Sequence, residues 1–133
     1  MVVTAIVIAA FTLLLFLPSL LLGNRTDHTC VDMKTNTALA VEGVASAEFS
    51  CEQSFEGSTQ NGFVTVNANT ETEVVKTMDK VLYAFATKSG MAATWRAPSE
   101  FKSQDGSIVV YPSALGFNGT PWVSDLRKHY GVN

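Results

Sequence analysis

The sequence has little that marks a catalytic, metal-binding or nucleic-acid-binding protein. Only 2 of its 133 residues are cysteine and 2 are histidine. The chain has 9 Lys or Arg and 12 Asp or Glu, which gives a net charge of −3. Binding to nucleic acid requires a basic face that neutralises phosphates, so no nucleic-acid partner is expected. The glycines are scattered and form no phosphate-binding run.

The few residues with reactive side chains do not form a recognisable site. His28, Cys30, Cys51 and His129 are the possible zinc ligands, and no two of them have zinc-finger spacing. A nucleophilic Cys30 activated by His28 is disfavoured, because no Asn or Asp that would orient the histidine can be identified. We expect no catalytic residue, no metal and no cofactor, and we predict that the protein is not an enzyme.

The N-terminal residues are the most distinctive part of the sequence. Residues 2–23 carry no charged side chain and raise the mean hydropathy of the whole chain to +0.18. As a helix they would span roughly 31 Å, close to the hydrocarbon thickness of a bilayer. A cleaved signal peptide is the alternative, but no basic residue precedes the apolar run and no small-x-small cleavage site follows it. We therefore predict a single transmembrane helix over residues 1–23 that anchors the chain in the cell membrane.

The side of the membrane on which the domain lies is predicted from the polar residues that follow the apolar run. The positive-inside rule has only Arg25 and Lys34 to count near the span and leans weakly towards a cytoplasmic domain. Abundant Ser, Thr and Asn, together with an even number of cysteines, favour the extracytoplasmic side. Cys30 and Cys51 are the candidate disulfide pair there, and two unpaired thiols are the alternative.

Residues 24–30 are predicted as a linker, and residues 31–133 as one α+β domain. A first helix is expected to run to about Val41. A strict alternation places Ala45, Ala47, Phe49 and Cys51 on one face of a half-buried strand. Residues 53–62 are expected to form a polar turn, and residues 63–67 a second strand.

The second half of the domain contains the best-defined helix. Thr70 begins a capping box, and an apolar stripe follows at helical spacing, formed by Val74, Met78, Val81, Leu82 and Phe85. Further strands are expected over 91–96, 101–103 and 107–111, with Asp105-Gly106 as a hairpin turn. Thr120 and Pro121 are expected to begin the last helix. With a short strand near residues 24–30, this order predicts a ferredoxin-like sandwich with an antiparallel sheet and a C-terminal helix.

Two stretches carry a family resemblance, VEGVASAEFS (41–50) and GFVTVNANTETEVVKTMDKVLYAF (62–85). They resemble small actinobacterial membrane-anchored extracytoplasmic proteins with a ferredoxin-like domain, similar to heavy-metal-associated domains. The Cys-x-x-Cys metal pair of the latter is missing, because Met33 stands where the second cysteine would follow Cys30. The resemblance thus implies a fold and no metal.

An aromatic-rich loop is the main candidate for a contact surface. Tyr111, Leu115, Phe117 and Trp122 either close the core or dock on a partner, since aromatic anchors dominate interface energies. The leading hypothesis is a non-enzymatic accessory or bracing subunit, with integral membrane proteins of a larger complex and the lipid bilayer as partners. The alternative is a membrane-anchored ligand-binding or sensing domain, which a pocket of convergent polar groups would favour.

Overall fold

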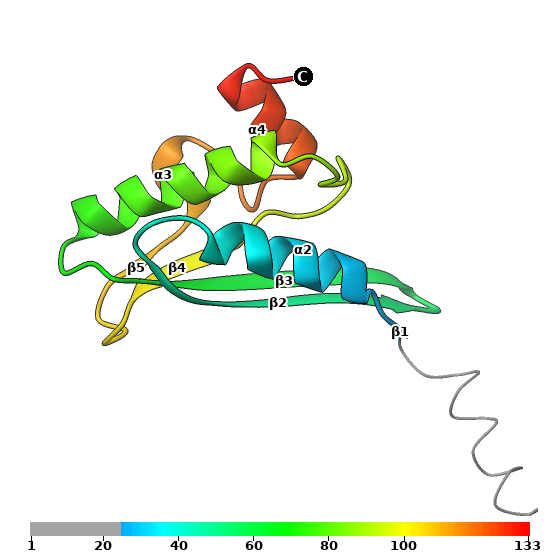
Figure 1. The fold of residues 1–133 in the computed structure, drawn as a ribbon, viewed down its shortest axis with the longest axis horizontal. Coiled ribbons are helices and arrows are strands. Elements are labelled where there is room, and N and C mark those ends of the chain that lie inside the picture. Colours follow the sequence, from blue (N-terminus) through cyan, green and yellow to red (C-terminus); the bar gives the residue numbers. More distant parts are fainter. Residues whose placement is uncertain (1–24) are drawn as a thin grey trace, which may run out of the picture.

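The structure, a computed structural model, describes residues 25–133. Helices α2 and α3 lie on one face of a five-stranded sheet, and α4 lies beside α3 on the side away from the sheet (Figure 1). The elements follow the order β1 (Arg25–Thr26), α2 (His28–Leu39), β2 (Val44–Ser54), β3 (Gly57–Val66), α3 (Glu71–Thr87), β4 (Glu100–Ser103), β5 (Val109–Val110), the 3₁₀ helix η1 (Pro112–Leu115) and α4 (Val123–Tyr130). The prediction of an α+β domain is confirmed.

Within residues 25–133, none of the helices combines the length and the apolar character needed to cross a membrane. The transmembrane helix predicted over residues 1–23 lies outside the described residues. The linker predicted over residues 24–30 is largely structured, because β1 pairs with β2 and α2 already begins at His28.

The predicted ferredoxin-like topology with an antiparallel sheet is wrong. The strand order is β1-β2-β3-β4-β5, so every strand lies beside its neighbour in sequence, whereas the ferredoxin-like fold is a split βαβ arrangement. The sheet is also mixed, because β3 and β4 are parallel. Helix α3 provides the crossover that a parallel pair requires. The expected strand near residues 24–30 exists, but it has two residues and lies at the sheet edge.

The polar turn predicted over residues 53–62 is also wrong, because β2 and β3 continue through it as a long hairpin. The pairing extends to Ser54 and Gly57, which leaves only Phe55 and Glu56 in the turn. Backbone ladder bonds hold these polar residues extended although their side chains lack strong strand propensity. Gly57 adopts φ +127°, which side-chain-bearing residues rarely reach.

The capped helix predicted from Thr70 is confirmed as α3. The Thr70 hydroxyl accepts from the Glu73 amide, and the Glu73 carboxylate accepts from the Asn69 amide. The five residues of the predicted stripe are fully buried and pack on the inner face of the sheet, together with Ala47, Phe49, Val64, Val66 and Phe101. The alternation predicted for β2 is confirmed from Ala47 to Cys51, beyond a bulge between Val44 and Ser46.

The strand predicted over 91–96 does not form, since this segment is a loop with a single bridge between Arg96 and Trp122. The last helix begins two residues later than predicted, with Trp122 as its N-cap. Contacts with the loop hold the preceding residues extended, because the Thr120 carbonyl accepts from Arg96 and the Pro121 carbonyl accepts from Ala97. Tertiary hydrogen bonds thus override the local Thr-Pro start signal.

Candidate functional site

A cleft of about 650 Å³ lies between the start of α2, the β2–β3 hairpin and the loop before β4. Such a volume is typical of a site for a small organic molecule. Its walls combine a disulfide, two indole rings and polar side chains. The lining residues are Asp27, Cys30, Cys51, Glu52, Gln53, Ser58, Gln60, Ala93, Thr94, Trp95, Trp122 and Ser124.

One wall of the cleft is the disulfide between Cys30 and Cys51, which confirms the predicted pair. The S–S distance is 2.02 Å and the Cα atoms are 6.1 Å apart. The bond joins α2 to β2, and the amide of Asp27 adds a hydrogen bond to the Cys51 carbonyl at 2.8 Å. Both thiols are therefore consumed, which removes them as zinc ligands. Among residues 25–133, no three His, Cys, Asp or Glu side chains come close enough together to hold a metal ion.

A buried lysine lies behind the cleft. Lys34 is only 1% exposed, and its Nζ donates to Oε1 of Gln60 at 2.6 Å. Burial lowers the pKa of the Lys34 amine from 10.5 to about 8, and the negative charge of Asp27 opposes this shift. Asp27 is itself fixed, because it is the N-cap of α2 and its carboxylate accepts from the Cys30 amide.

The amide of Gln60 links this lysine to the opposite wall. Its Oε1 also accepts from the backbone N–H of Arg96 at 2.8 Å. The Arg96 guanidinium lies 3.5 Å from the centroid of the Trp122 ring and donates to the Thr120 carbonyl at 2.7 Å. A cation over an indole face is a stabilising contact. Trp122 therefore sits in a fixed position although 39% of its surface is exposed.

Other polar side chains of the cleft have no partner within the described part of the chain. No residue from 25 to 133 hydrogen-bonds to the side chains of Gln53, Ser58, Thr94 or Ser124. The carboxylate of Glu52 is exposed and is likewise free there of a hydrogen-bond donor. These groups are available to a bound molecule.

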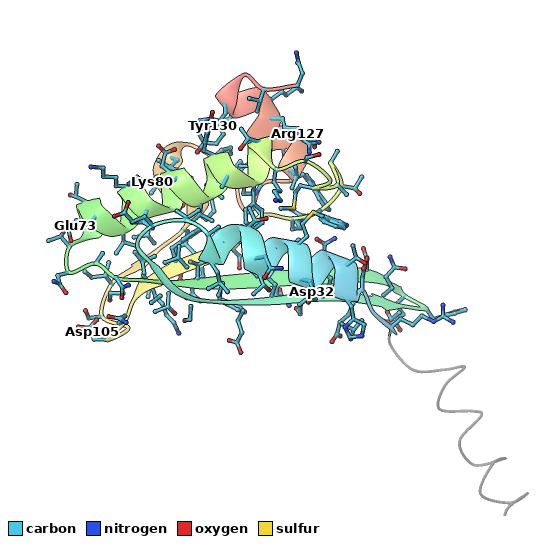
Figure 2. The ribbon with its side chains drawn as sticks, viewed as in Figure 1. Asp32, Glu73, Lys80, Asp105, Arg127 and Tyr130 are labelled. Atoms are coloured by element: carbon cyan, nitrogen blue, oxygen red, sulfur yellow. A yellow bond between two sulfur atoms is a disulfide. The ribbon has the colours of Figure 1, made fainter. Side chains whose placement is uncertain are left out.

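Helix α4 holds the loop that carries Trp95. From α4, Arg127 donates to the carbonyls of Ala86 and Met91, at 3.3 and 2.6 Å. Tyr130, one turn further along, donates to the Asp79 carboxylate at 2.6 Å. Figure 2 shows Arg127 and Tyr130 on α4, above α3. The pKa of Tyr130 is raised by burial and by the Asp79 carboxylate.

The four predicted interface residues do not share one environment. Tyr111 is 54% exposed, whereas Leu115 and Phe117 are half-buried against the core. Phe117 packs on His129, with ring centroids 4.6 Å apart. Trp122 lines the cleft. That these residues dock on a partner stays a prediction.

Three residues of this region, Lys34, Gln60 and Trp95, were not predicted as site residues from the sequence. A signal for Lys34 was present, because α2 buries Cys30, Lys34, Thr37 and Ala38, which recur at the helical spacing of one face. No local signal marked Gln60, because residues 53–62 have turn-like composition. Trp95 was assigned to a strand that does not form.

No protein-family model matches the chain, and no significant similarity to a curated protein or to a solved structure is found. The resemblance to small actinobacterial membrane-anchored proteins therefore stays a prediction.

Proposed function

We propose that this chain is a non-enzymatic ligand-binding domain and that its cleft takes a small organic molecule rich in hydrogen-bond donors. The observation that carries the proposal is the convergence of Trp95 and Trp122 with free polar side chains around one cavity. Indole rings supply large apolar contact surfaces, and a few polar groups fix the orientation of a ligand.

The charged groups of the cleft define the chemistry of the ligand. Asp27 and Glu52 are the only charged side chains in its lining, and ionised carboxylates accept hydrogen bonds without donating them. The ligand should therefore present hydroxyl or amine groups to them. The same two charges disfavour an anionic ligand.

The proposed location is the extracytoplasmic face of the cell membrane. Support comes from the uncharged apolar sequence of residues 2–23 and from the Cys30–Cys51 disulfide, a bond that persists in oxidising compartments. A ligand encountered there, such as a saccharide or amino sugar, has the hydroxyl and amine donors that the cleft requires.

Three probes that share one ring and differ in charge test this proposal. Glucosamine, glucose and glucuronate are titrated into the protein, and intrinsic tryptophan fluorescence is recorded. We expect glucosamine to bind at least as tightly as glucose, and glucuronate to bind most weakly, because Asp27 and Glu52 attract the amine and repel the carboxylate. Tightest binding by glucuronate, or no saturable response to any probe, contradicts the proposal.

A matched pair of glutamates supplies the control. Glu52 and Glu48 are both exposed on β2, but only Glu52 lines the cleft. Glu52→Gln should weaken glucosamine binding roughly two- to fivefold, the range of an exposed charge pair. Glu48→Gln should leave it unchanged, and equal effects of both variants would show that the response comes from net charge alone.

The accessory-subunit hypothesis is the second candidate, and the uncovered face of the sheet favours it. Phe63 on β3 is 41% exposed there, and Val109 on β5 is 40% exposed. No helix among the described elements covers this face (Figure 1). Purification from membranes followed by mass spectrometry tests it, with Phe63→Ser expected to reduce recovery of integral membrane partners. Recovery of the chain alone contradicts it.

A further inference from the structure

Among residues 25–133, the most exposed large apolar side chain lies at the tip of the β2–β3 hairpin. Phe55 has a relative exposure of 107%, so none of its ring is covered by the protein. Ser54 and Gly57, the last pair of the ladder, flank the turn. The Ser54 hydroxyl donates to the Gly57 carbonyl and accepts from the Glu56 amide, at 3.2 and 3.3 Å. The turn is thus held without any contribution from the Phe55 ring.

The register of β1 places this tip beside the N-terminal end of the described chain. Arg25 pairs with Gln53 and Thr26 pairs with Glu52, in an antiparallel arrangement. Arg25 is therefore the end of β1 nearer the tip. Phe55 lies two residues beyond Gln53, which is about 7 Å past the level of Arg25 along the strand.

The sequence preceding Arg25 indicates which surface the hairpin tip would meet. Residues 2–23 carry no charged side chain, and this apolar run ends two residues before Arg25. A chain that emerges from a bilayer at the end of that run brings Phe55 to the membrane surface, because two extended residues also measure about 7 Å. Burying an aromatic ring in the acyl boundary is favourable, and the folded domain leaves the Phe55 ring fully exposed.

We propose that the β2–β3 hairpin inserts Phe55 into the interfacial region of the lipid bilayer and so fixes the tilt of the domain on the membrane. The inference rests on the membrane association predicted for residues 2–23 and not on the ligand of the cleft. A lipid surface is a better match than a protein partner, because the neighbours of Phe55 are polar or lack side chains. The turn offers no contiguous apolar patch for an interface core, because the residues around Phe55 are Ser54, Glu56, Gly57 and Ser58.

Photo-crosslinking of the full chain in phosphatidylcholine vesicles tests the proposal. The photoreactive residue p-benzoylphenylalanine replaces Phe55 in one variant and Tyr83 in the other. Tyr83 is the control because it is 50% exposed but belongs to α3, on the helix layer above the sheet. Vesicle flotation before irradiation measures membrane association separately from the position of the hairpin.

We expect both variants to float with the vesicles, and lipid adducts at position 55 to exceed those at position 83 by at least roughly fivefold. Equal lipid adducts at the two positions, or adducts to protein alone at position 55, overturn the proposal. Failure of the chain to float overturns its premise as well, whereas the binding of saccharide probes by the cleft would be unaffected. Phe55→Ser should retain the melting temperature of the unmodified chain, which confirms that the ring has no role in folding.

Discussion

Nζ of Lys34 donates a 2.6 Å hydrogen bond to Oε1 of Gln60, and this contact joins α2 to β3 behind the cleft. The same oxygen accepts from the Arg96 amide, so Gln60 links the buried lysine to the loop that carries Trp95. The arrangement buries the Lys34 amine against a residue that lines the cleft. Its consequences for stability and binding can be measured.

Replacing the buried lysine should stabilise the protein at neutral pH. Lys34→Met removes an amine whose burial lowers its pKa to about 8, and Gln60 keeps its bond from Arg96. We expect the free energy of unfolding to rise by about 1 kcal/mol at pH 7, in line with replacements of buried charges by apolar groups. Urea denaturation measures the change, and Lys80→Met on the exposed face of α3 is the matched control. Destabilisation by Lys34→Met would show that the amine contributes net stability.

The same lysine should give the unmodified protein a distinctive pH dependence. The pKa of Lys34 is about 8 in the folded state and 10.5 for an unperturbed lysine, as in the unfolded state, so the unfolded state binds more protons between these values. The free energy of unfolding should therefore rise with pH from about 8 towards 10.5. Denaturation at several pH values between about 8 and 9 checks this, because Tyr130 in the unfolded state ionises only near its ordinary pKa of 10. An identical slope in Lys34→Met would contradict the assignment.

Loss of the disulfide should destabilise the domain. Cys30 and Cys51 are 21 residues apart in sequence, and a cross-link of that span contributes about 3 kcal/mol in the chain-entropy model. The Cys30→Ser/Cys51→Ser variant should lose about that amount in chemical denaturation. A reductant should lower the melting temperature of the unmodified protein and leave the variant unchanged. No response of the unmodified protein to reductant would show that the bond is absent or contributes no stability.

A close approach between β3 and its neighbours should make Gly62 intolerant of any side chain. A Cβ atom at Gly62 would lie 2.6 Å from the Phe49 ring and 3.1 Å from Cα of Pro98. Gly62→Ala should therefore cost about 1–3 kcal/mol, the usual penalty for overpacking. Asn61→Ala, one residue away and exposed, is the control. Equal melting temperatures for the two variants would contradict the packing described for this strand.

The contribution to stability of the hydrogen bond between α4 and α3 can be measured by removing the Tyr130 hydroxyl. Tyr130→Phe deletes the hydroxyl that donates to Asp79 and should cost about 1 kcal/mol. Tyr83→Phe is the matched control, since within residues 25–133 the Tyr83 hydroxyl has no hydrogen-bond partner. If both variants melt at the same temperature, the contact does not contribute to stability.

The sequence predicted those elements whose signals are local. The cap at Thr70 and the stripe from Val74 to Phe85 specify α3, because capping and helical periodicity act within a few turns. The cysteine pair was also predictable, since only two cysteines exist to pair. Strand neighbours were not predictable in the same way, because the parallel pairing of β3 with β4 depends on where the crossover helix packs.

The cleft was unpredictable for a related reason. Its lining comes from four segments that the fold brings together, and each segment alone has an ordinary composition. Ser58 and Gln60 have a turn-like sequence, yet ladder bonds with β2 make them strand residues. Trp122 was expected within a helix begun by Thr120 and Pro121, but it is the N-cap, its own amide donates to Asp125, and its ring lies against Arg96.

Nuclear magnetic resonance of the two indole N–H groups is the most direct test of ligand binding. The chain contains only two tryptophans, Trp95 and Trp122, and both line the cleft, so each indole signal reports on this site. We expect both signals to shift saturably as glucosamine is added, and Glu52→Gln to weaken the response while Glu48→Gln does not. Indole signals that stay unchanged at saturating probe would contradict the claim that this cleft is the binding site.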